Sequence, residues 1–182
     1  MKFLPTYLSD ILLIEPVVCS DERGFFFEIY NEYQFAKAGL TYSFVQDNYS
    51  GSCKGVLRGL HYQIQQPQGK LILVVSGEIF DVCVDLRRSS STFGKWMGQS
   101  ISADNRLMIW IPPGFAHGYY VISDWAEIAY KVTEFYAPQW ERTLMWNDPA
   151  IGIKWPLHHD VPLLLSTKDA TGYNLDQAEV FD

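Results

Sequence analysis

Residues 71–86 read LILVVSGEIFDVCVDL and decide the fold class. Two apolar segments flank a Ser-Gly pair at positions 76 and 77, and this pattern predicts a β-hairpin with its turn at Gly77. In the second segment Phe80, Val82, Val84 and Leu86 occupy one face of the strand. The alternate residues, from Ile79 to Asp85, occupy the other.

Further short strands follow at intervals of about ten residues, a spacing typical of β-sandwiches and barrels. One helix is predicted at residues 31–38, because Asn31 can cap it, Gln34 can complete a capping box and Gly39 can end it. We therefore predict an all-β, jelly-roll type barrel or sandwich with a few short peripheral helices. Residues 1–182 are expected to form a single domain, with the last ~40 residues wrapping the barrel. The other predicted strands lie in KWMGQSIS (95–102), RLMIWIP (106–112), HGYYVIS (117–123) and AEIAYKVTEFY (126–136).

The charge balance argues against partners that are polyanions. With 14 Lys and Arg against 21 Asp and Glu, the formal net charge is −7 at pH 7. This field repels nucleic acid and anionic membranes, so neither is expected as a partner. The three cysteines have no CxxC spacing, and no signal peptide or membrane span is evident. We therefore expect a cytoplasmic protein.

A Pro-Gly turn precedes a histidine in IPPGFAHGYYV (111–121), where Pro112, Gly114 and His117 form a P-x-G-x-x-H pattern. This pattern resembles the second half of a cupin signature. In metal cupins the first half supplies two histidines one residue apart and a glutamate. Here that position reads His61-Tyr62-Gln63 with no glutamate in the next six residues. Because Gln is a weak metal ligand, we expect no metal site.

Arg58 and His61 lie three residues apart in VLRGLHYQ (56–63). Strict alternation places them on opposite faces of a strand. If both line one cavity, the strand must bulge, and Gly59 is the expected position. If the strand is regular, Arg58 can reach the cavity only from an end of the strand.

Several motifs together closely resemble the dTDP-4-dehydrorhamnose 3,5-epimerase family. The resemblance runs from about Asp21 to Asp169, with the motifs in order and at compatible spacing. They are DERG followed by FFFEIY (21–30), QDNYSGSCKGVLRGLHYQ (46–63), DVCVDLR (81–87), IPPGFAHGYYV (111–121), AYKVTEFYAP (129–138), ERTLMWNDP (141–149) and LSTKD (165–169).

The resemblance implies a cofactor-independent epimerase that inverts carbons 3 and 5 of dTDP-4-dehydro-6-deoxy-D-glucose in dTDP-L-rhamnose synthesis. Such a reaction needs a base, an acid and a group that stabilises the enolate oxygen. By resemblance, His61 is the base, Asp169 orients it, Tyr130 is the acid and Lys70 stabilises the enolate. An imidazole suits the role of base because it titrates near neutral pH.

The resemblance also implies the groups that bind the nucleotide sugar. Arg58 and Arg23 are expected at the diphosphate and His117 near the sugar or phosphate. Tyr136 shares strand parity with Tyr130, about 20 Å away at ~3.3 Å per residue, and is expected to stack on the thymine. In the family, the early strand crosses to the partner subunit, which implies a homodimer. The remaining contacts implied by the family are Phe26, Glu28, Gln46, Asp47, Asn48, Glu141 and Lys168.

Three alternatives remain open from the sequence. One is an epimerase of another deoxysugar pathway that inverts a single carbon. The second is a metal-dependent cupin, against which the missing second histidine and glutamate argue. The third is a metal-free cupin that binds nucleotide sugars without turnover.

Overall fold

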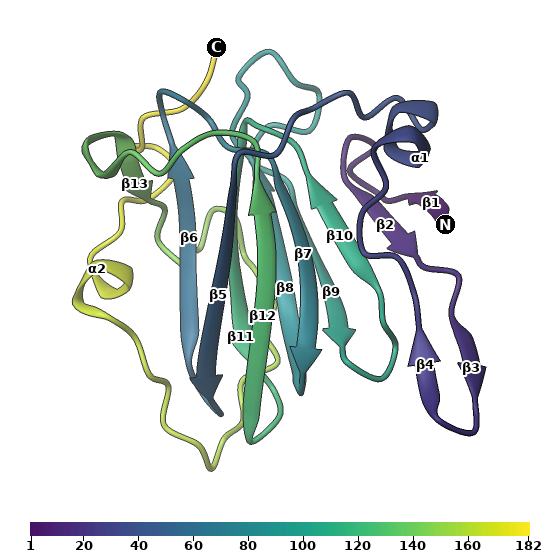
Figure 1. The fold of residues 1–182 in the computed structure, drawn as a ribbon. Helices are drawn as coiled ribbons and strands as arrows, with labels where there is room; N and C mark the ends of the chain where they lie inside the picture. The colour runs from purple at the N-terminus through teal and green to yellow at the C-terminus, as the bar shows by residue number, and fades with distance from the viewer.

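The computed structural model describes residues 1–182, and most of its regular structure is antiparallel β-sheet (Figure 1). Two sheets face each other, in the order β1-β2-β10-β7-β12-β5 and β13-β6-β11-β8-β9. The protein is therefore an all-β jelly roll of the cupin type, as predicted. The six-stranded sheet contains β1 (Lys2–Pro5), β2 (Leu12–Glu15), β5 (Gln46–Cys53), β7 (Lys70–Ser76), β10 (Met108–Ile111) and β12 (Trp125–Val132). The five-stranded sheet contains β6 (Leu57–Gln63), β8 (Glu78–Asp85), β9 (Trp96–Ser102), β11 (Phe115–Val121) and β13 (Glu141–Thr143).

The main core lies between the two sheets. Ile72 and Ile128 of the six-stranded sheet belong to the same buried cluster as Ile79 and Cys83 of β8. Val82, which points the other way from β8, belongs to a second cluster with parts of the C-terminal segment. The predicted division of β8 into two faces is therefore confirmed.

The predicted hairpin at Gly77 is wrong. Strand β7 pairs with β10 and β12, whereas β8 pairs with β11 and β9, so the chain passes at this point from one sheet to the other. Gly77 has φ +76°, and a Cβ there would lie 2.0 Å from the backbone oxygen of Trp125. Only glycine fits this corner, and a local Ser-Gly turn does not reveal which sheet the next strand joins.

The predicted early helix is confirmed as α1 (Glu32–Lys37). Asn31 caps it by accepting a hydrogen bond from the backbone N–H of Gln34. The reciprocal half of the capping box is wrong, because the Gln34 side chain instead donates to Glu28 and accepts from the amino group of Met1.

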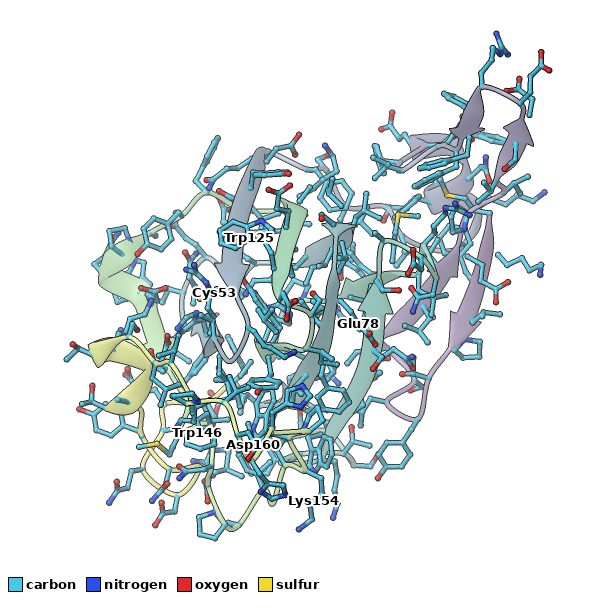
Figure 2. All side chains as sticks on the ribbon, turned by 90° about the horizontal axis from the view of Figure 1, so that it is seen from below. Cys53, Glu78, Trp125, Trp146, Lys154 and Asp160 are labelled. Atoms are coloured by element: carbon cyan, nitrogen blue, oxygen red, sulfur yellow. The ribbon has the colours of Figure 1, made fainter.

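The remaining elements lie at the periphery. Two short strands, β3 (Cys19–Asp21) and β4 (Gly24–Phe26), form a hairpin that projects away from the two large sheets (Figures 1 and 2). Beyond β13 the chain runs mostly as irregular segments along the five-stranded sheet, joined to it and to neighbouring loops by isolated bridges. It includes α2 (Thr167–Ala170), and a single 3-10 turn, η1 (Pro138–Trp140), precedes β13. No helix is long and apolar enough to cross a membrane.

The predicted bulge in β6 is confirmed. His61 pairs with His117 of β11, but Arg58 pairs with Tyr119, so three steps on β6 match two on β11. Gly59 lies in this irregularity with φ +123°, and a Cβ there would lie 2.6 Å from the Cα of Gly118. The extra residue turns Arg58 and His61 toward the same cavity.

Candidate active site

A cavity of about 290 Å³ lies between the two sheets where β5 and β6 face each other. Strands β5, β7 and β12 contribute one wall, and β6 and β11 contribute the other. Its lining brings together most of the residues expected from the sequence. They are Gln46, Asn48, Arg58, His61, Lys70, His117, Tyr130, Tyr136, Glu141 and Lys168.

His61 forms a close pair with Asp169, the residue that the sequence analysis assigned to it. The imidazole Nε2 lies 2.5 Å from Oδ1 of Asp169, which is only 3% exposed. The same carboxylate accepts hydrogen bonds from the Ser166 hydroxyl and from the backbone N–H of Gly59. Burial lowers the pKa of His61, while the Asp169 carboxylate opposes this effect. The imidazole is therefore neutral near pH 7 and able to accept a proton.

Asp169 is held as a carboxylate. Its burial favours the protonated form, but the hydrogen bonds from His61 and Ser166 outweigh it and lower the pKa. Ser166 is also the N-cap of α2 and accepts from the Asp169 N–H. Helix α2 thus places the carboxylate beside β6 although His61 and Asp169 are far apart in the sequence.

Lys70 is at the start of β7, where a lysine is often solvated, but here it lines the cavity. Its Nζ donates a hydrogen bond of 3.4 Å to the backbone oxygen of His61. Burial lowers the pKa of Lys70 to about 8, and nearby Cys83 and Asp81 oppose part of this shift. The ammonium is still the main form at neutral pH and supplies positive charge inside the cavity.

His117 stands beside His61 across the β6–β11 ladder and has its own acidic partner. Its Nε2 lies 2.8 Å from Oδ2 of Asp81, a residue that is 1% exposed. Asp81 thus fixes the orientation of the imidazole ring, and the second ring nitrogen is left to bind a ligand in the cavity.

Tyr136, Glu141 and Lys168 form a group at the rim. The Tyr136 hydroxyl donates to Oε2 of Glu141 at 3.0 Å, and Lys168 donates to Oε1 at 2.8 Å. Burial alone would raise the pKa of Glu141, but Lys168 outweighs it and lowers that pKa.

The predicted strand shared by Tyr130 and Tyr136 is wrong. Strand β12 ends at Val132, and the chain then turns, so strand parity does not relate the two tyrosines. Both nevertheless line the same cavity. The turn is held by Gln63, whose side chain donates to the Phe135 oxygen and accepts from the Ala137 N–H.

Arg58 lies at the exposed side of the cavity and reaches β5. Its Nε donates to the Ser52 hydroxyl at 3.0 Å. On β5 the side chains alternate, so Gln46 and Asn48 line the cavity and are hydrogen-bonded to each other. Asp47 points the other way and pairs with Lys131 at 2.8 Å, so it does not line this chain's own cavity.

Three other expected contacts lie outside the cavity of their own chain. Arg23 and Phe26 belong to the projecting β3–β4 hairpin, where Arg23 pairs with Asp21 and Phe26 is 70% exposed. The Glu28 carboxylate accepts from the side chains of Asn31 and Gln34 at the start of α1. The hairpin joins neither large sheet.

The sequence analysis missed several lining residues. Strand parity would have found them, because each lies two residues from a predicted site residue on the same strand: Ser50 follows Asn48, Ile72 follows Lys70, Tyr119 follows His117 and Ile128 precedes Tyr130. Gln68 had no such signal. Nowhere in residues 1–182 do three His, Cys, Asp or Glu side chains gather as a metal site would require.

The fold and the cavity together define a jelly-roll enzyme built for acid–base chemistry. A profile of the dTDP-4-dehydrorhamnose 3,5-epimerase family matches residues 5–177. The chain belongs to this family of isomerases. A relative of that name from Pseudomonas aeruginosa is 54% identical over 182 residues, covering 100% of this chain and 99% of the relative.

Other relatives agree with this assignment. A protein of the same name from Shigella flexneri is 50% identical over 183 residues, covering 100% of this chain and 99% of the relative. A crystal structure of dTDP-6-deoxy-D-glucose-3,5-epimerase from Legionella pneumophila, in complex with dTDP-4-keto-L-rhamnose, superposes with a TM-score of 0.95. It is 47% identical, with 98% of this chain and 94% of that chain covered.

Proposed function

We propose that the protein inverts carbons 3 and 5 of dTDP-4-dehydro-6-deoxy-D-glucose, as a dTDP-4-dehydrorhamnose 3,5-epimerase in dTDP-L-rhamnose synthesis. The observation that carries the proposal is the His61–Asp169 pair facing Tyr130 across one cavity. Lys70 lines the same cavity. These groups supply the base, the acid and the positive charge that the reaction needs.

The ketone at carbon 4 acidifies the C–H bonds at carbons 3 and 5. Neutral His61 removes the proton, and the Asp169 carboxylate stabilises the imidazolium that forms. Negative charge then develops on the ketone oxygen, where the Lys70 ammonium stabilises the enolate. Tyr130 returns a proton to the carbon. Inversion requires that the two protons cross opposite faces of the sugar.

The two sheets supply the two faces. His61 belongs to β6 of the five-stranded sheet, and Tyr130 belongs to β12 of the six-stranded sheet. A sugar bound between them has the base on one side and the acid on the other. Burial raises the pKa of Tyr130, with a further contribution from Tyr119, so the phenol stays protonated until the carbanion demands its proton.

The nucleotide is assigned to the rim of the cavity. Arg58, exposed and flanked by the neutral Ser52 hydroxyl, is free to bind the diphosphate. Tyr136 stacks on the thymine, and Glu141 with Lys168 holds the tyrosine and contacts the base or ribose. Gln46, Asn48 and His117 complete the binding of sugar and phosphate.

We propose further that residues 1–182 act as a single domain and that the protein is a cytoplasmic homodimer. Arg23, Phe26 and Glu28 would then contact the nucleotide in the partner's cavity, since they cannot reach their own. The exposed aromatic side chains of the β3–β4 hairpin support burial against another surface. Sedimentation analysis should give twice the chain mass. Arg23→Ala should weaken substrate binding without unfolding the protein.

Deuterium exchange tests the reaction directly. The purified protein is incubated with dTDP-4-dehydro-6-deoxy-D-glucose in deuterium oxide, and the proton NMR signals at carbons 3 and 5 are followed. We expect both signals to disappear, and His61→Asn to abolish both losses. Loss of one signal would indicate a single-inversion epimerase. Binding without loss of either would indicate a nucleotide-sugar-binding protein without turnover.

A further inference from the structure

Tyr119 places a second phenol in the cavity that the proposed mechanism does not use. Its side chain is 7% exposed and lines the cavity from β11. The next residue, Tyr120, is 1% exposed and points the other way, where its hydroxyl accepts from the backbone N–H of His158. Two adjacent buried tyrosines thus have opposite orientations, and only one belongs to the site.

The Tyr119 hydroxyl has one polar partner, the hydroxyl of Ser50, at 3.3 Å. Either oxygen can donate this hydrogen bond, so a proton can pass in either direction. The contact crosses the cavity, because Tyr119 belongs to the five-stranded sheet and Ser50 to the six-stranded sheet. Ile72 and Ile128 line the same region, where a phenylalanine would pack equally well. A buried hydroxyl that packing does not require suggests a chemical role.

The hydroxyl pair lies close to Tyr130. On β5 and β12, Tyr130 pairs with Asn48 and Ile128 pairs with Ser50, so Ser50 is one same-face step from the acid. Tyr119 and Tyr130 line the same cavity, and an ionised Tyr119 would raise the pKa of Tyr130. On the other side, Ser50 lies on the same face of β5 as Ser52, which the exposed Arg58 contacts at the cavity mouth.

The double inversion creates a need that this arrangement meets. Each reprotonation of carbon leaves Tyr130 as a phenolate, so the phenol must regain a proton before the second carbon can be inverted in the same binding event. A bound nucleotide sugar fills the cavity and restricts direct access of water to Tyr130. A chain of hydroxyl groups that leads from the cavity mouth to Tyr130 could deliver this proton without release of the substrate.

We propose that Tyr119 and Ser50 form a proton relay that restores Tyr130 between the two inversions. In the substrate complex the Tyr119 hydroxyl gives its proton to the Tyr130 phenolate, across a contact that must close because the two hydroxyls are not hydrogen-bonded in this structure. Ser50 then donates to the Tyr119 oxygen, and water donates to the Ser50 oxygen. The net transfer is one proton from solvent to Tyr130, and no electrons move. Tyr119 acts through Tyr130 and does not itself react with the sugar. The inference rests on the proposed function of the site.

Single-turnover exchange in deuterium oxide tests the relay. With enzyme in excess, the reaction is quenched at early times and mass spectrometry counts product molecules that carry one or two deuterium atoms. We expect Tyr119→Phe to increase the fraction with a single deuterium about tenfold, which is less than the ~10²-fold effect of losing a general acid because Tyr130 itself is kept. Ser50→Ala should act in the same direction, because it breaks the same path.

Tyr120→Phe is the matched control. It also removes one buried tyrosine hydroxyl from β11, but outside the cavity, and the ratio of singly to doubly labelled product should match that of the unaltered protein. Thermal melts of both variants should show similar stability, because only one oxygen is removed. A merely structural role for Tyr119 would slow both exchanges equally and leave the ratio unchanged.

Two results would overturn the relay: a ratio in Tyr119→Phe equal to that in Tyr120→Phe, or an equal slowing of both exchanges. Failure of the proposed function looks different. In that case the unaltered protein itself would exchange neither carbon, or only one.

Discussion

Replacing Asp169 by asparagine isolates the electrostatic part of the base. The carboxylate lies 2.5 Å from His61 Nε2 and is almost fully buried. Asparagine has nearly the same shape. Its one oxygen can still accept from the Gly59 N–H and from His61, and its NH2 group can donate to the Ser166 oxygen, so the fold should be retained. What disappears is the negative charge that stabilises the imidazolium when His61 has accepted the proton.

The magnitude follows from the hydrogen bond. A hydrogen bond to a charged group contributes about 1.5–3 kcal/mol, and this one strengthens in the transition state. At about 1.4 kcal/mol per decade, kcat should fall roughly 10- to 150-fold. Asp169 does not line the cavity, so KM should change less than about threefold, as expected for an interaction made in the transition state.

The pH profile gives an independent readout. Activity requires neutral His61 and is lost as pH falls through the pKa of that imidazole. Because Asp169 raises that pKa, against the larger lowering by burial, its removal should shift the acidic limb to lower pH. The assay is the initial rate of proton loss at carbons 3 and 5 by NMR from pH 5 to 9.

Asp124→Asn is the control, because it removes one carboxylate from a surface pair with Lys54 and Asp124 is not a predicted site residue. Its kcat, KM and pH profile should be unchanged. A kcat for Asp169→Asn within threefold of the unaltered protein would refute the pairing argument. So would an acidic limb that moves to higher pH.

Three further predictions concern the charge of Lys70, the backbone at Gly59 and the side chain of Tyr136 at the cavity rim. Lys70 has a pKa of about 8, so kcat should decline above pH 8 as the ammonium loses its proton. Lys70→Arg should move this decline to higher pH. If the decline stays at the same pH, it belongs to another titrating group. Gly59→Ala should lower the free energy of unfolding, measured in urea, by about 2–4 kcal/mol. The new Cβ would lie 2.6 Å from the Cα of Gly118, and the backbone φ of +123° disfavours alanine. A loss below about 1 kcal/mol would show that the bulge can adjust to a side chain. Tyr136→Ala should raise KM about tenfold by removing the thymine stack while kcat changes little, and a loss in kcat alone would contradict the assignment to nucleotide binding.

Local patterns in the sequence predicted much of the fold. Alternation identified the strands and the two faces of β8, because a strand exposes alternate side chains to opposite sides whatever it pairs with. The cap at Asn31 located α1 for a similarly local reason. The spacing of Arg58 and His61 even predicted the bulge at Gly59, since two residues three apart share a face only when the strand is irregular.

The failures share a different origin. A turn at Gly77 is compatible with a hairpin and with a corner between sheets, and only the pairing of distant strands distinguishes them. Asp47, which the resemblance implied at the nucleotide, lies on the other face of β5 from Gln46 and Asn48, and only the tertiary structure shows its pairing with Lys131. The end of β12 at Val132 depends on Gln63, which is far away in the sequence and holds the turn after the strand.

By itself, the sequence determined the all-β class, the strand faces and, through resemblance, the family and most of the cavity residues. Tertiary structure alone decided the geometry of these groups and the partner of Tyr119. The pairs His61–Asp169 and Tyr119–Ser50 are separated by 108 and 69 residues; the first joins β6 to helix α2 of the C-terminal segment, and the second joins the two sheets across the cavity. Burial and charge then set the pKa values of His61 and Lys70, because both depend on what surrounds a side chain in space rather than on its neighbours in the chain.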